Sequence, residues 1–132
     1  MEKLSKKFRF LTICAIGQQD DMRSLMSLSD VIVARPGTGT TSESILAGCP
    51  ILFNTIGGIM PQECITVRYM RARGIESPLI RRPSDLSTLI RPLVESQSNR
   101  VFARQAINSL RPDSEPSQIV AFLRELALNN HL

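Results

Sequence analysis

The chain lacks several residues that common functional sites require. Its 132 residues include no tryptophan, one tyrosine and five scattered phenylalanines. Aromatic platforms for stacking nucleic-acid bases are therefore not expected. The single histidine, His131, is the penultimate residue, which excludes a histidine-based catalytic triad and argues against a histidine-rich metal site. We expect no metal, no bound cofactor and no nucleic-acid partner.

Cysteines are few, and their number is odd: Cys14, Cys49 and Cys64. Two of them lie in apolar runs, where cysteine behaves as a small buried hydrophobe. This usage predicts a reducing compartment without a disulfide framework. No apolar run reaches the ~18–20 residues of a membrane span, and no signal peptide is recognised. We expect a cytoplasmic protein, with peripheral association at the inner membrane face as a further option.

The charge is biased towards arginine. Sixteen basic residues face twelve acidic ones, and the only lysines are Lys3, Lys6 and Lys7. Arginine binds phosphate groups in a two-point fashion, so a phosphorylated ligand or an anionic membrane surface fits this bias. A solvated surface is the simpler explanation of the same charges.

Four short apolar runs predict strands, at residues 10–16, 31–34, 49–54 and 77–80. The first three are nearly continuous and rich in β-branched residues, which is typical of strands buried on both faces of a parallel sheet. Pro78 interrupts the fourth run and favours an edge strand.

Helices are predicted between and after these strands. The expected landmarks are a cap at Asp20–Asp21, a start at Thr40 and stop at Gly48, a start at Pro61 and end at Gly74, and helices over 84–95, 99–110 and 116–128. Pro92 is expected to kink or split the first of the last three. The pattern predicts one α/β domain over residues 1–132, a Rossmann-like, doubly wound parallel sheet of about four strands.

The segment RPGTGTTSE, residues 35–43, follows the second predicted strand. Gly37 and Gly39 allow the backbone to approach a ligand closely, while Thr38 and Thr40 add hydroxyl groups. The free N–H groups of a helix N-terminus suit a phosphate or diphosphate. No lysine follows the glycines, so the ATP- and GTP-binding P-loop is absent and an NTPase is disfavoured.

Two residues of this segment have alternative interpretations. Thr40 and Glu43 match a capping box, yet Glu43 is equally placed to accept hydrogen bonds from ribose hydroxyls. Arg35 is placed to reach a phosphate, although pairing with a carboxylate or simple solvation is favoured for an arginine at a strand end.

The second segment, GGIMPQE at residues 57–63, follows the third predicted strand. Gln62 and Glu63 fall in the first turn of the next helix, and neighbouring amide and carboxylate groups suit a polyhydroxylated ligand. Alternatively, Glu63 simply favours the positive end of the helix. Beside the first segment, a ligand is the preferred interpretation.

The stretch from Asp20 to Glu63, DDMRSLMSLSDVIVARPGTGTTSESILAGCPILFNTIGGIMPQE, resembles the glycosyltransferases of family 28. That family includes the peptidoglycan N-acetylglucosaminyl transferase and the diacylglycerol galactosyl- and glucosyltransferases. The resemblance implies the nucleotide-sugar domain of a metal-independent GT-B fold. It further implies that residues 37–40 meet the diphosphate of a UDP sugar, that Glu43 holds the ribose, and that Gln62 and Glu63 hold the sugar.

Parts of that family pattern are absent from this sequence. The acceptor-binding domain and the first βαβ unit of the donor domain are missing, so the resemblance implies a truncated half of a GT-B fold. The expected reaction is transfer of a hexosyl group to a hydroxyl acceptor, with lipid-linked acceptors preferred. A separate acceptor-binding domain or subunit is expected to be required for activity. The catalytic base is unassigned. The alternatives are a non-catalytic nucleotide-sugar-binding or interaction module and a UDP-sugar epimerase-like fragment.

Overall fold

The computed structural model describes residues 14–112 and 116–129. In chain order the elements are α2 (Met22–Leu28), β1 (Ile32–Ala34), α3 (Thr38–Ala47), β2 (Ile51–Asn54), α4 (Pro61–Ala72), β3 (Leu79–Ile80), α5 (Pro83–Glu95), α6 (Gln97–Asn108) and α7 (Pro116–Asn129). Helices and strands alternate from α2 to α5, which confirms the predicted α/β class. The strand predicted at 10–16 lies mostly outside the described residues, and its described part, 14–16, is irregular and exposed.

The described strands form one parallel sheet in the order β1-β2-β3. Ala34 of β1 pairs with Phe53 of β2, and Asn54 of β2 pairs with Ile80 of β3. β3 lies at an edge of the described sheet, as the proline at position 78 predicted. Two-sided burial is confirmed for β2 but wrong for β1, where Val33 is 43% exposed because β1 forms the other edge of the described sheet.

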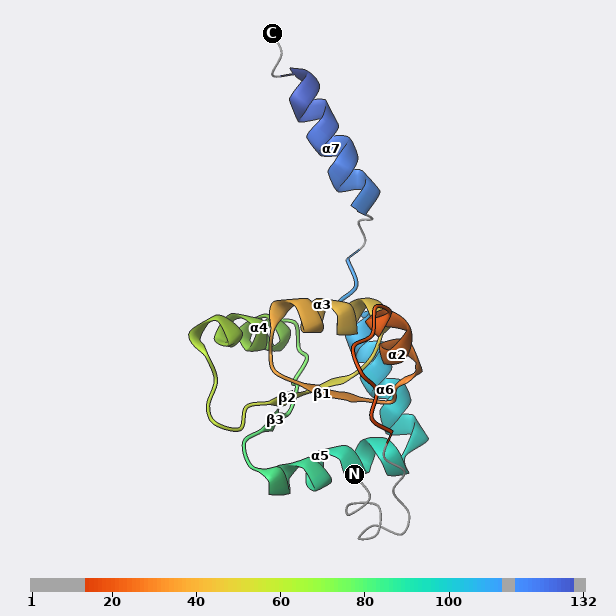
Figure 1. Cartoon of the computed structure of the whole chain (residues 1–132), viewed down its shortest axis with the longest axis vertical. Helices are drawn as coiled ribbons and strands as arrows, with labels where there is room; N and C mark the ends of the chain where they lie inside the picture. The colour runs from red at the N-terminus through yellow and green to blue at the C-terminus, as the bar shows by residue number, and fades with distance from the viewer. Residues whose placement is uncertain (1–13, 113–115, 130–132) are drawn as a thin grey trace.

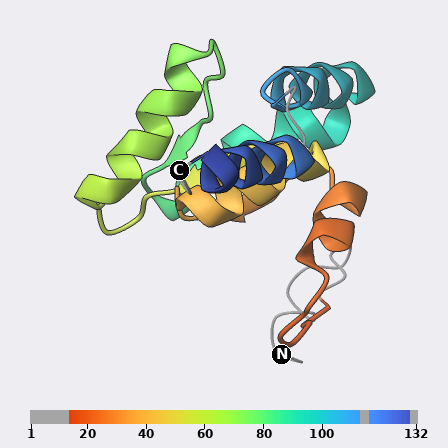
Figure 2. The same cartoon turned by 90° about the horizontal axis from the view of Figure 1, so that it is seen from above.

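Helices cover both faces of the sheet. Figure 1 shows α3 and α4 on one face and α5 on the other. The strand order follows the chain, so right-handed crossovers place α3 and α4 on the same side. Seen from above in Figure 2, α3 lies between α4 and α6. The described strands do not include the reversal of strand order that defines a doubly wound sheet.

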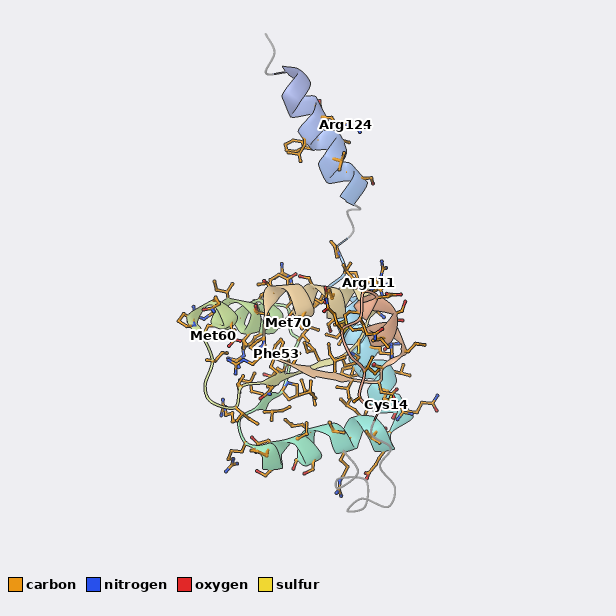
Figure 3. The ribbon with its side chains drawn as sticks, viewed as in Figure 1. Cys14, Phe53, Met60, Met70, Arg111 and Arg124 are labelled. Carbon is orange, nitrogen blue, oxygen red and sulfur yellow. The ribbon has the colours of Figure 1, made fainter. Side chains whose placement is uncertain are left out.

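The core lies between the sheet and the α3, α4 and α6 helices. Figure 3 shows Phe53 of the central strand below Met70 of α4, and both side chains are buried. Their cluster also contains Ile45, Ile51, Ile107 and Leu110. A second cluster joins Met26, Ala47 and Cys49. The burial of Cys49 is therefore confirmed, whereas Cys14 is exposed, contrary to the prediction from its apolar run.

Local signals fix most helix ends. Asp21 caps α2 by accepting a 3.0 Å hydrogen bond from the N–H of Ser24. Gly48 ends α3 in the left-handed conformation, with φ of 66°. The predicted split at Pro92 is wrong, since α5 continues through it to Glu95, and the alternative, a kink, stays a prediction. Pro92 lacks the N–H that would donate to the carbonyl oxygen four residues earlier, so α5 continues with one helical hydrogen bond fewer.

No described helix has the length and apolar character needed to cross a membrane.

Candidate functional site

The two sequence segments singled out above lie at the same edge of the sheet. The segment 35–43 follows β1, and the segment 57–63 follows β2. These strands are parallel neighbours in register, so their carboxyl ends open onto the same edge. Ligands of open α/β sheets commonly bind at this edge. The shared edge was predicted from the sequence and is confirmed.

Arg35 ties the two segments together. Its guanidinium donates to both carboxylate oxygens of Glu63, from Nε at 2.9 Å and from Nη2 at 2.5 Å. It also donates to the carbonyl oxygens of Ile56 and Gly58, at 3.3 and 2.9 Å. One side chain therefore fixes the start of α4 and the loop before it relative to the end of β1. Pairing of Arg35 with a carboxylate was the favoured interpretation and is confirmed.

Glu63 is held as an ionised group inside this contact. Its side chain is 3% exposed, and it accepts a further hydrogen bond of 2.8 Å from the N–H of Met60. The Arg35 guanidinium, followed by the Met60 N–H, lowers the pKa of Glu63 below its ordinary value. Because Glu63 is the third residue of α4, its charge also faces the positive end of that helix.

The N-terminus of α3 is open. Gly37 is the N-cap residue and carries no side chain that accepts a hydrogen bond. The first helical bond runs from the N–H of Thr41 to the carbonyl oxygen of Gly37, at 3.0 Å. The N–H groups of Thr38, Gly39 and Thr40 precede it and have no helical acceptor. They form a set of donors at the carboxyl edge of β1.

The predicted helix start at Thr40 is wrong, and with it the capping box. The helix begins at Thr38, so Thr40 is its third residue and is not the N-cap. The extended backbone of Gly37, with φ of −75° and ψ of 145°, supplies the N-cap conformation three residues earlier than Thr40 would. Glu43 consequently lies in the second turn, exposed and away from the helix end.

The glycines of the first segment are not required by the fold. Gly37 has an ordinary negative φ, and Gly39 lies inside the helix without a positive φ. A Cβ atom built on either would meet no atom within 4 Å. At a position inside a helix, such as that of Gly39, glycine is less stable than alanine by about 0.5–1 kcal/mol. The sequence thus leaves open space over the backbone that carries the free N–H groups.

The glycines of the second segment have a conformational reason. Gly57 and Gly58 have φ angles of 84° and 101°, which side-chain-bearing residues rarely adopt. They turn the chain so that the carbonyl oxygen of Gly58 faces Arg35. Gln62 follows this turn on the exposed side of α4, where its amide nitrogen contacts the sulfur of Met60 at 3.4 Å.

The structure thus groups the predicted residues in two sets. Gly37, Thr38, Gly39 and Thr40 form the open start of α3, and Glu63 pairs with Arg35 at the start of α4. The exposed Glu43 and Gln62 belong to neither set. Sequence reasoning missed the contacts of Arg35 with the carbonyl oxygens of Ile56 and Gly58. No local pattern signals a contact across 21 or 23 residues of chain.

In residues 14–112 and 116–129, no three histidine, cysteine, aspartate or glutamate side chains gather as a group able to hold a metal ion. His131 lies outside the described residues.

A scan against models of known protein families finds no match to this chain, and a search of curated proteins finds none either.

Proposed function

We propose that the chain binds a nucleotide diphosphate sugar at the carboxyl edge of β1 and β2. The observation that carries the proposal is the open start of α3, where three N–H groups have no helical acceptor and lie beside glycines that leave space for a ligand. Such a helix end attracts a diphosphate through hydrogen bonds and the helix dipole. It also stabilises the charge on a departing diphosphate.

The ribose and the sugar of the proposed ligand are assigned to side chains near this helix end. Glu43 is exposed and free of the capping role, so it is proposed to accept hydrogen bonds from the ribose hydroxyls. Gln62 presents its amide to the hydroxyls of the sugar. The oxygens of Glu63 already accept from Arg35 and Met60, so Glu63 is proposed to position the loop, and its direct contact with the sugar stays a prediction.

In this proposal the chain is the donor-binding half of a GT-B-type hexosyltransferase that acts on a hydroxyl acceptor, with a lipid-linked acceptor preferred. An acceptor-binding domain or subunit would complete the cleft. The second candidate is a non-catalytic nucleotide-sugar-binding module. The pairing of Glu63 with Arg35 favours this candidate, because it removes one carboxylate from acid–base chemistry at the site.

Titration with UDP, followed by amide chemical shifts of the labelled chain, tests the proposal. We expect shifts at residues 37–43 and at Gln62, with smaller shifts for ATP because the P-loop lysine is absent. Uridine is the matched control, since it lacks the diphosphate and should shift residues 38–40 little. A folded sample whose residues 37–43 do not respond to millimolar UDP would contradict the proposal.

A further inference from the structure

The last described helix, α7, has an apolar face that is largely exposed in the described part of the chain. Figure 1 shows α7 projecting from the α/β body on the side of α3 and α4. Its Phe122 and Leu123 are 60% and 56% exposed. A single helix of 14 residues is marginal in water, and most helical stability in proteins comes from packing of the apolar face. The helix therefore needs a surface to cover Phe122 and Leu123.

A partly apolar groove lies beside residues 109–112, the last described residues before α7. We call it the α3–α4 groove; it has a volume of about 600 Å³ and is lined mainly by Ser42, Leu46, Tyr69, Arg73 and the segment 109–112. Leu46 and Tyr69 are 45% and 39% exposed. The groove thus offers apolar surface, and its wall includes the residues that lead directly to α7.

Charge also matches between helix and groove. Arg73 lies 3.8 Å over the ring of Tyr69, and Arg111 lines the same groove. On a helix with 3.6 residues per turn, Glu125 lies one turn from Phe122 and flanks the apolar face, whereas Arg124 lies on the opposite side. A helix that places Phe122 and Leu123 in the groove therefore keeps a carboxylate at the edge of a groove that carries two guanidinium groups, and turns its own arginine towards solvent.

We propose that α7 docks its Phe122–Leu123 face into the α3–α4 groove of its own chain. The tether decides between the same chain and a second copy. Pro112 and Pro116 are separated by three residues, a span of at most about 14 Å at ~3.6 Å per residue. A tether this short gives α7 an effective concentration in the millimolar range at the groove of its own chain. A second copy in solution rarely reaches such a concentration. The docking does not depend on the proposed nucleotide site.

Hydrogen exchange of the α7 amides in the full chain tests the docking. In the wild type these amides should exchange at least about tenfold more slowly than in Phe122→Asp, because burial of a large apolar side chain is lost. Ala121→Asp adds the same charge on the opposite side of the helix and should keep the slow exchange. Leu46→Asp, which alters the groove, should release α7 as Phe122→Asp does.

Unchanged exchange of the amides of β2, the buried central strand, shows that the body remains folded in each variant. Equal α7 exchange in the wild type and Phe122→Asp overturns the proposal. Slow exchange that is lost on dilution, together with a dimer in sedimentation, also overturns it, since a second copy would then supply the groove.

Discussion

Arg35 and Glu63, 28 residues apart in the chain, form a two-point ion pair that joins the end of β1 to the start of α4. The same guanidinium holds two carbonyl oxygens of the intervening loop. The pair thus fixes the loop between β2 and α4 against Arg35, which follows β1 and precedes α3. This contact links the stability of the chain to the shape of its candidate site.

Removal of this contact should destabilise the chain. Arg35→Ala leaves the buried Glu63 carboxylate and two loop carbonyl oxygens without their donor, and unpaired buried groups are costly. We expect the melting temperature to fall by several degrees. Arg35→Lys should rescue only part of the loss, because a lysine cannot supply the planar fork. Glu43→Gln, at an exposed carboxylate, is the control and should melt as the wild type does.

Stability should also depend on pH through Glu63. Its folded pKa lies below the ordinary value of 4.5, so the ionised form stabilises the fold above that pH. This contribution is lost as the pH falls through the folded pKa. The difference in unfolding free energy between the wild type and Glu63→Gln should be largest near neutral pH and shrink in acid. A difference that stays constant from about pH 7 to about pH 3 would show that protonation of Glu63 does not change the free energy of unfolding.

Glu43→Gln separates ligand contact from structure. The helix starts at Thr38, so Glu43 has no cap to support and its replacement should leave the melting temperature unchanged. Loss of a charged acceptor for the ribose hydroxyls should weaken UDP binding by about 10- to 100-fold. Calorimetric titration and melting, performed on the same sample, give both values. A lowered melting temperature with unchanged affinity would assign Glu43 a structural role.

Gly48→Ala should be among the more damaging glycine substitutions. The left-handed backbone of Gly48, with φ of 66°, disfavours a side chain, and a Cβ would meet Oδ1 of Asn108 at 2.5 Å. We expect a loss of about 1–2 kcal/mol in unfolding free energy. Denaturant unfolding measures this loss, and a variant as stable as the wild type would contradict the assigned helix end.

The sequence predicts elements where a local pattern is sufficient. Pro61 marks the first residue of α4, and the runs ending at Ala34 and Asn54 mark β1 and β2. The start of α3 was misplaced because Thr40 and Glu43 fit a capping box, whereas the extended backbone of Gly37 begins the helix earlier. The Arg35 contacts were beyond local reasoning, since they join residues that only the fold brings together.

The affinity of Gly39→Ala for UDP tests the central claim most directly. The added methyl group meets no protein atom, and alanine is the better helix former, so stability should stay equal or rise by up to about 1 kcal/mol. The same methyl group occupies the space assigned to the diphosphate. We predict that calorimetric titration finds UDP binding weakened at least about tenfold in a protein that melts no lower than the wild type. Unchanged UDP affinity in Gly39→Ala would contradict the placement of a diphosphate at the start of α3.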